Sequence, residues 1–349
     1  MLTRGPRGPR VHEVGGLWVV FSGTPHTKRR GFMRTDIRRP SPDAGFRHDA
    51  LFYSGTDGFV TRTSAFIRDS VAEGEPILVV VSEEKIELLR RELGGDPDGV
   101  RFADMQQIGR NPARIIPAWR DFAAEHARSG RRFRGIGEPI WATRSASELA
   151  ECARHEALLN LAFAVGQAWW LACPYDTGSL PEAVLAEAER NHPWVMHEGE
   201  RFGSPTYRGL DDVARPFDDP LPEPEGSVRE HRFAGESLAT LRRHVAGAAA
   251  AYGLDPARTG DMVLIANEIA TNSVRHGGGS GTLRMWEDTG SVICEVRDRG
   301  RILDPLVGRT KPPADRGSGF GLWLANELCD LVQIRSLPTG SVVRLHLGR

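Results

Sequence analysis

The sequence predicts an N-terminal α/β domain and a C-terminal α+β domain. Between residues 46 and about 200, apolar strand-like runs alternate with helical patterns, as in a parallel sheet with helices on both faces. From residue 230 onward, a periodic helix precedes a hairpin and a glycine-rich loop that opens another helix. This second pattern indicates a helix layer on a mixed sheet. The length of 349 residues suits two domains of ordinary size.

Composition narrows the class of protein. The chain is 40% hydrophobic and 26% charged, with a formal net charge of -1, which gives no global electrostatic reason to expect nucleic acid binding. Polar residues interrupt the apolar region 158–175, so we expect no membrane span. The cysteines show no C-x-x-C spacing, and we expect buried thiols in a reducing cytoplasm rather than disulfides or zinc ligands. They are Cys152, Cys173, Cys294 and Cys329.

Residues 1–45 are rich in Arg, Gly and Pro and lack sustained periodicity, which predicts a disordered basic arm. The short apolar run 17–21 is too brief for a signal-peptide core and could instead add an edge strand. A basic arm could also contact nucleic acid. A transcription regulator acting through this arm is therefore a third hypothesis, although no helix-turn-helix pattern stands out.

The N-terminal domain is predicted over residues 46–203. The all-apolar run 77–81 is typical of a strand buried on both faces. Expected strands cover residues 48–54, 76–82, 100–104, 133–141 with its exit loop, and 169–176. Expected helices cover residues 58–74, 85–93, 111–129, a segment opened by Ser147 as N-cap, and 180–190. In the first helix Phe59, Phe66, Ile67 and Val71 are expected to face inward.

A proline-rich, acidic stretch over residues 204–229 is typical of a semi-rigid linker between domains. It leads into residues 230–349. The beginning of this second domain, residues 232–245, is expected to end in an amphipathic helix.

The most informative stretch is residues 261–277, DMVLIANEIATNSVRHG. Its apolar residues Met262, Ile265, Ile269 and Val274 predict one buried helical stripe. Glu268 and Asn272 are four residues apart and so share one face of that helix. An amide oxygen can bind a hard cation such as Mg²⁺, and a carboxylate can deprotonate a nucleophile. Polar pairs of this spacing are also common on solvent-exposed helices, so the helix alone does not decide the function.

Two further motifs follow in order. Strands are expected at 282–287 and 291–297, and the second runs into Asp298-Arg299-Gly300, where a carboxylate could accept a hydrogen bond from an exocyclic amine. After a loop, Gly317, Gly319 and Gly321 precede a helix expected over 322–332. Glycines at a helix start let backbone N–H groups approach phosphate oxygens.

These three motifs resemble those of the GHKL (Bergerat) ATPase fold, in the branch of anti-sigma-factor serine/threonine kinases. NEIATNSVRHG resembles the N box, DRG the G1 box and GSGFGLWLAN the G2 box. The resemblance implies ATP as cofactor, with Asn272 holding Mg²⁺ and Glu268 as general base. It also implies that Asp298 contacts adenine, that Gly300 belongs to the G1 box, and that Gly317, Gly319 and Gly321 form the lid. Where this family usually has a second G1 glycine, the chain has Ile302.

Residues 46–203 resemble the MEDS sensory domain, a RecA-like α/β module without a phosphate loop. The resemblance is carried by HDALFYS, GEPILVVVS, FRGIGEPIW, HEALLN and ACPYD, in that order. It implies signal input, with a small molecule as the possible signal. Because α/β sheets place ligands at strand ends, candidate pocket residues are His48, Tyr53, Glu138, Trp141, Glu156 and Tyr175. Packing is the alternative role for these aromatic and acidic side chains.

Together these features predict a cytoplasmic signalling regulator in which a sensory domain controls an ATP-dependent serine/threonine kinase. By resemblance its partners would be an anti-anti-sigma factor, a sigma factor or both, and the first helix of the ATPase domain could support a homodimer. The alternative is a non-catalytic module that binds ATP and sequesters its partner.

Overall fold

The computed structural model describes residues 45–127, 130–210, 219–288, 290–312 and 319–349. Nearly all of the predicted basic arm, including the apolar run 17–21, lies outside these ranges, as does the lid residue Gly317.

The N-terminal sheet contains seven described strands in the order β3-β2-β4-β5-β1-β6-β7. All neighbours pair in parallel except the edge strand β7, which runs antiparallel to β6. The parallel sheet is thereby confirmed, while the last two short strands were not anticipated. The strands are β1 (Phe46–Tyr53), β2 (Ile77–Val81), β3 (Val100–Asp104), β4 (Arg134–Gly137), β5 (Trp169–Asp176), β6 (Trp194–His197) and β7 (Glu200–Gly203).

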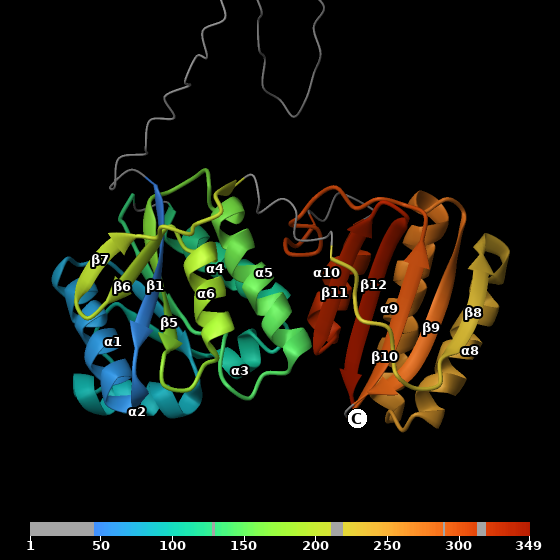
Figure 1. Ribbon diagram of the computed structural model, residues 1–349, viewed down its shortest axis with the longest axis horizontal. Helices are drawn as coiled ribbons and strands as arrows, with labels where there is room; N and C mark the ends of the chain where they lie inside the picture. The colour runs from blue at the N-terminus through green and yellow to red at the C-terminus, as the bar shows by residue number, and fades with distance from the viewer. Residues whose placement is uncertain (1–44, 128–129, 211–218, 289, 313–318) are drawn as a thin grey trace, which may run out of the picture. The chain divides into compact units, whose positions relative to one another are not determined.

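Helices cover both faces of this sheet (Figure 1). α1 (Gly55–Ala72) and α2 (Glu83–Leu93) pack on one face, and α4 (Ile115–Ala127), α5 (Ala146–Ala162) and α6 (Glu182–Asn191) pack on the other. The short helix α3 (Met105–Ile108) follows β3. Every residue of β2 is buried, as its continuous apolar run predicts.

Four local predictions are wrong. Val71 is 38% exposed, because the buried stripe of α1 runs through Phe59, Phe66 and Ile67 instead. The N-cap of α5 is Ser145, whose hydroxyl accepts the Glu148 N–H while the Glu148 side chain accepts the Ser145 N–H.

The other two wrong predictions concern helix boundaries. The helix expected from residue 111 begins as a separate 3₁₀ turn, η1 (Pro112–Arg114), capped by Asn111, before α4 starts at Ile115. α10 (Phe320–Leu328) ends four residues early, because Leu331 already belongs to the next strand.

The C-terminal sheet has the order β11-β12-β10-β9-β8. A mixed sheet was expected, but each pairing in the described sheet is antiparallel. The hairpin predicted around Gly290 is formed by β9 and β10. The strands are β8 (Arg229–Ala234), β9 (Ser280–Asp288), β10 (Ser291–Asp298), β11 (Leu331–Leu337) and β12 (Gly340–Gly348).

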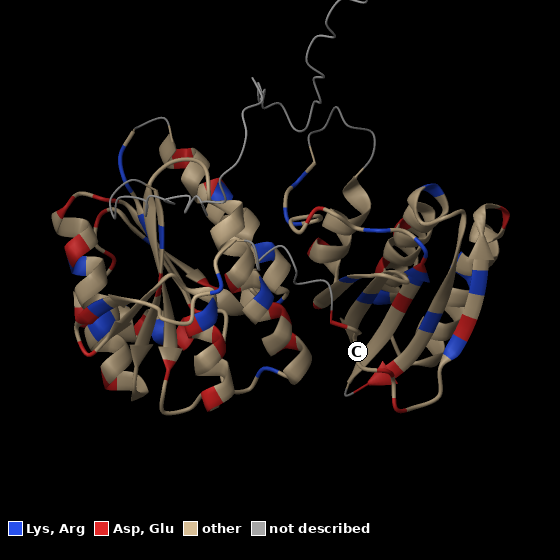
Figure 2. Ribbon diagram, turned by 45° about the horizontal axis from the view of Figure 1, so that its top comes forward, with Lys and Arg blue, Asp and Glu red and all other residues tan. Residues whose placement is uncertain are grey.

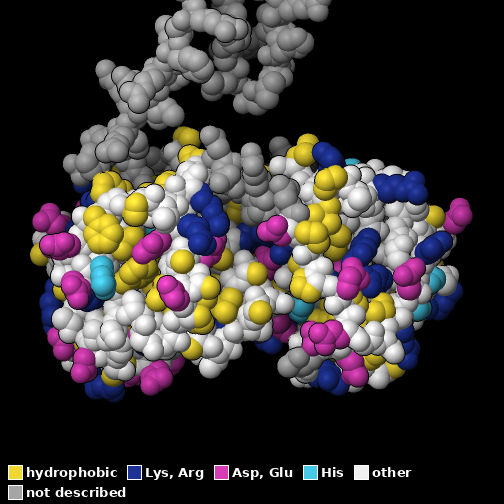
Figure 3. Space-filling model, viewed as in Figure 1, with side chains coloured by type: hydrophobic (Ala, Val, Ile, Leu, Met, Phe, Trp, Pro, Cys, Tyr) yellow, Lys and Arg dark blue, Asp and Glu magenta, His cyan; other side chains and the backbone are white. Residues whose placement is uncertain are grey.

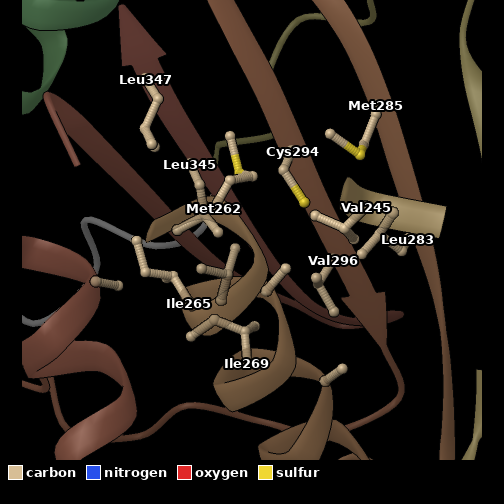
Figure 4. Packing of buried hydrophobic residues seen from close by; sticks show 14 of the residues in the cluster. Val245, Met262, Ile265, Ile269, Leu283, Met285, Cys294, Val296, Leu345 and Leu347 are labelled. Carbon is tan, nitrogen blue, oxygen red and sulfur yellow. The ribbon is translucent and has the colours of Figure 1, made fainter. Parts of the chain in front are cut away.

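A layer of three helices covers one face of this sheet: α8 (Leu238–Ala251), α9 (Pro256–His276) and α10. A short 3₁₀ turn, η2 (Gly235–Ser237), links β8 to α8. Figure 4 shows Met262, Ile265 and Ile269 of α9 directed toward apolar side chains of the sheet such as Cys294 and Val296. Because α9 buries this stripe, its remaining polar side chains must lie on other faces of the helix.

The opposite face of the C-terminal sheet is polar and is partly covered by the end of the linker. Glu295 is fully buried there and accepts hydrogen bonds from the guanidinium groups of Arg284, Arg297 and Arg344. From the linker, Glu223 accepts hydrogen bonds from Arg284 and Arg297. The end of the predicted linker is therefore attached to the second domain rather than spanning open solvent.

Among the described helices, none combines the length and the apolar character needed to cross a bilayer. Acidic and basic side chains are interspersed over the described helices and strands (Figure 2). The space-filling view likewise shows apolar side chains distributed among charged ones on the visible face (Figure 3).

Candidate functional site

α9 presents Glu268 and Asn272 side by side on a half-buried face. The helix begins at Pro256, with the Asp255 carboxylate accepting the Arg258 N–H at 2.9 Å, and this cap fixes the start of the helix. Ile265 and Ile269, on the adjoining face of the helix, then anchor it in the core. The four-residue spacing predicted from the sequence therefore holds in the structure.

The start of α10 approaches these two side chains closely through Gly321. A Cβ atom at this position would lie 3.0 Å from Asn272 Nδ2 and 3.2 Å from Glu268 Cβ. Just before the helix, Gly319 has a φ of 101°, in the left-handed region that favours glycine. Glycine therefore lets backbone reach the polar pair at a point where a side chain would fill the space.

Asp298 is the last residue of β10, and its carboxylate is held in a fixed position. Its Oδ1 accepts hydrogen bonds from the Gly300 N–H at 2.8 Å and the Ser341 hydroxyl at 2.7 Å. A Cβ atom on Gly277 would lie 2.6 Å from Asp298 Oδ2, so this glycine, too, allows close approach.

These groups line one cavity of about 350 Å³. It brings together six of the seven residues predicted from the sequence; the seventh, Gly317, lies outside the described residues. The six are Glu268, Asn272, Asp298, Gly300, Gly319 and Gly321. Acidic and amide groups lie in the same cavity as apolar side chains from Ile302, Val307 and Val343. The apolar side chains could contact a flat ring, and the acidic and amide groups could bind a charged tail with its metal ion.

Sequence reasoning missed Ser341 and the apolar wall. Ser341 lies on β12, antiparallel to Asp298 on β10, so its proximity depends on strand pairing between distant segments. Ile302 is partly buried against the core, and its N–H donates to Ser336 Oγ at 2.9 Å. Ser341 lies in no recognisable local motif, and Ile302 was noted in the sequence only as a departure from the G1 box, not as part of a cavity wall.

The candidate sensory residues of the N-terminal domain separate into distinct groups. Tyr53 donates a hydrogen bond to Glu138 at 2.6 Å, and Lys85 binds the same carboxylate. Burial raises the pKa of the Tyr53 phenol and that of the Glu138 carboxyl. Trp141 instead lies under the Arg144 guanidinium, with 3.8 Å between the guanidinium carbon and the ring centroid.

His48, Glu156 and Tyr175 belong to another buried group, which also contains Cys173 and His192. His48 Nε2 lies 3.1 Å from Glu156 Oε2, and the His192 and Tyr175 ring centroids are 5.6 Å apart. Burial lowers the pKa of His48. Sequence reasoning found His48 and Glu156 through the family resemblance but missed Cys173 and His192, whose local surroundings carry no ligand motif.

Comparison with known proteins accounts for both domains. Residues 47–193 match the family model of the MEDS (methanogen/methylotroph, DcmR sensory) domain, and residues 233–347 match that of the histidine kinase-like ATPase domain. The chain joins a MEDS-type domain to a histidine kinase-like ATPase domain. The second match implies that the ATPase domain binds ATP, and its residue range contains the whole cavity around Glu268 and Asp298.

No curated protein significantly matches the chain. Among solved structures, one match is the crystal structure of the RsbU and RsbW domains of Rv1364c from Mycobacterium tuberculosis, at 19% identity and a TM-score of 0.27. The match covers 34% of this chain and 32% of that one, so the chain spans about a third of the length of that relative.

Proposed function

We propose that this chain is a signalling regulator in which the MEDS domain controls an ATP-dependent serine/threonine kinase of the anti-sigma-factor type. The substrate would be a serine or threonine hydroxyl on an anti-anti-sigma partner, and a sigma factor would be an alternative binding partner. Support comes from the N, G1 and G2 box resemblance, the match to the ATPase family and the contents of the cavity.

One observation carries the proposal: Glu268 and Asn272 are adjacent in the cavity that Asp298 and the glycines also line. ATP would fit this cavity. Among the described residues both hydrogen bonds to Asp298 end on Oδ1, so Oδ2 stays open to an exocyclic amine. Gly321 keeps free the space beside Asn272 and Glu268 that a Cβ atom would occupy.

Each residue then has a definite role. ATP with Mg²⁺ supplies the phosphoryl group when bound. The Asn272 amide oxygen offers a metal ligand, and the Glu268 carboxylate accepts the proton of the attacking hydroxyl. Asp298 would recognise the adenine ring of ATP, because its free carboxylate oxygen can accept a hydrogen bond from the exocyclic amine. Gly319 and Gly321, at the start of α10, would let backbone N–H groups and the helix dipole interact with the phosphates.

The test is Glu268→Gln, which preserves size and removes the proton acceptor. We expect phosphorylation of an anti-anti-sigma protein to fall by at least about a hundredfold, while ATP binding stays close to wild type. Mass spectrometry of the partner and calorimetric titration with Mg-ATP measure the two effects. Glu287→Gln serves as control, because Glu287 is an exposed glutamate on β9, outside the cavity lining. Undiminished transfer by Glu268→Gln would remove Glu268 as the base.

The alternative is an ATP-dependent binding module without transfer. Ile302 favours it, because an isoleucine packed on the core replaces the second G1 glycine of the family pattern. In that case wild-type chain would bind Mg-ATP and its partner, and no phosphate would appear on the partner.

A further inference from the structure

A cluster of four potential metal ligands lies in the interior of the MEDS-type domain. His48 on β1, Glu156 on α5, Cys173 on β5 and His192 just after α6 are each at most 1% exposed. One ligand atom from each of the four lies within 4.8 Å of the others. Three pairs of these atoms are closer still. His48 Nε2 is 3.1 Å from Glu156 Oε2 and 3.4 Å from Cys173 Sγ. His192 Nε2 is 3.3 Å from Glu156 Oε2.

Tertiary structure alone brings these residues together. β1 lies between β5 and β6 in the sheet, so segments more than a hundred residues apart in sequence become neighbours. Ala50 is opposite Cys173 in the parallel register, which puts His48 and Cys173 on the same face, two positions apart. α5 covers that face and directs Glu156 at both residues.

The hydrogen bonds around the cluster determine which nitrogen of each histidine carries its proton. His192 Nδ1 is 2.8 Å from the Ala188 carbonyl oxygen, which can only accept, so this nitrogen must donate. The Asn160 amide nitrogen is directed to backbone carbonyls, including that of Asn191, so its oxygen faces His48 Nδ1 at 3.1 Å and accepts. In each neutral ring the proton is therefore on Nδ1, and Nε2 presents a lone pair to the cluster.

The Glu156 carboxylate oxygen then meets the lone pairs of both Nε2 atoms with no proton on either contact, while the Cys173 thiol can donate to only one of these nitrogens, His48 Nε2. Such acceptor–acceptor contacts are unfavourable in a dry interior. Within the described structure, Glu156 Oε1 and His192 Nε2 also lack a hydrogen-bond partner. A cation among these atoms would resolve the repulsion by using the same lone pairs.

We propose that His48, Glu156, Cys173 and His192 bind one zinc ion. Zinc bonds to nitrogen, oxygen and sulfur of about 2.0–2.3 Å in a tetrahedron place the ligand atoms about 3.3–3.8 Å apart. The three contacts, at 3.1, 3.3 and 3.4 Å, are close to these edges. Each imidazole also donates its Nδ1–H to an oxygen, the outer hydrogen bond that metal-bound histidines usually make.

The ligand set indicates zinc and a closed site. A thiolate with two imidazoles and one carboxylate suits a borderline ion rather than Mg²⁺ or Ca²⁺. Four protein ligands leave no open position for substrate, which is typical of a structural site. The ion would tie β1, β5, α5 and the end of α6 together. This zinc site is independent of the proposed kinase activity.

The first test uses the full chain purified without a metal-affinity tag. Elemental analysis should find about one zinc per chain. Replacement with Co²⁺ should give a thiolate-to-cobalt charge-transfer band, a result that needs no variant. Cys173→Ser should abolish this band, and His192→Ala should weaken zinc binding by more than about a hundredfold, since even loss of an outer hydrogen bond costs 10- to 100-fold.

The matched control is Cys152→Ser. Cys152 is a fully buried thiol of the same domain that donates to the Pro139 carbonyl, so its variant should keep both zinc and the cobalt band. The proposal would be overturned by wild-type chain that neither contains nor takes up zinc, or that holds copper instead. Equal cobalt bands in Cys173→Ser and Cys152→Ser would also overturn it. So would nitrogen NMR showing both histidines doubly protonated without metal.

Discussion

At the scale of single residues, Gly321 shows how a position without a side chain shapes the cavity that we propose for ATP. It is the second residue of α10, and Asn272 and Glu268 occupy the space next to its Cα. The sequence identified this glycine as part of a lid motif. The structure shows a second role: because Gly321 has no side chain, α10 can approach α9 closely.

Gly321→Ala should therefore weaken ATP binding. The added methyl group would lie 3.0 Å from Asn272 Nδ2, and overpacking costs about 1–3 kcal/mol. We expect the Kd for Mg-ATP, measured by calorimetry, to rise at least about fivefold. Gly247→Ala is the control, because this exposed glycine lies in the interior of α8 with nothing within 4 Å of its Cβ position. The control should gain about 0.5–1 kcal/mol of stability and keep its ATP affinity; equal Kd values for both variants would contradict the role of Gly321.

At the scale of elements, the sequence predicted element types well and boundaries less well. β5 matches its predicted range, and β2 follows its apolar run. The misplaced cap of α5 has a physical reason: Ser145 and Ser147 both precede an apolar helix, and only Ser145 has glutamate three residues later. α10 was predicted too long because Cys329, Leu331 and Val332 are apolar, which suits either a helix or a buried strand.

The cap assignment can be checked by a pair of variants. Ser145→Ala removes the hydroxyl that accepts the Glu148 N–H and donates to the Glu148 carboxylate, while the residue 145 backbone N–H can still donate to that carboxylate. The variant should lower the free energy of unfolding by about 1 kcal/mol. Ser147→Ala removes a hydroxyl inside the first turn and should change stability by less than about 0.5 kcal/mol. Urea denaturation monitored by circular dichroism compares them. A larger loss in Ser147→Ala than in Ser145→Ala would reverse the assignment.

At the scale of the whole molecule, the end of the linker is held by charges on the polar face of the C-terminal sheet. Glu295 is buried among Arg284, Arg297 and Arg344, and Glu223 of the linker adds a second carboxylate at the surface. Hydrogen bonds from Arg297 and Arg284 lower the pKa of Glu223 to about 2. Its contribution to stability is thus complete above its ordinary pKa and is lost as the pH falls toward 2.

Removing the two carboxylates should have very different effects. Glu295→Ala leaves three guanidinium groups around an empty centre and should cost about 3–5 kcal/mol in the free energy of unfolding. Glu223→Ala removes a largely exposed ion pair and should cost less than about 1 kcal/mol at neutral pH. Chemical denaturation at pH 7 measures both. Similar losses of unfolding free energy in the two variants would mean that the buried Glu295 stabilises the protein no more than the exposed Glu223.

The sequence by itself determined the two fold classes, the order of the three nucleotide motifs and the pairing of Glu268 with Asn272, because hydrophobic period and residue spacing within one helix are local properties. Only the tertiary structure decided which distant residues meet. Strand order placed Ser341 against Asp298 and gathered His48, Glu156, Cys173 and His192 in one cluster. Such meetings depend on sheet register and on which helix covers which face, and no local pattern in the chain encodes them.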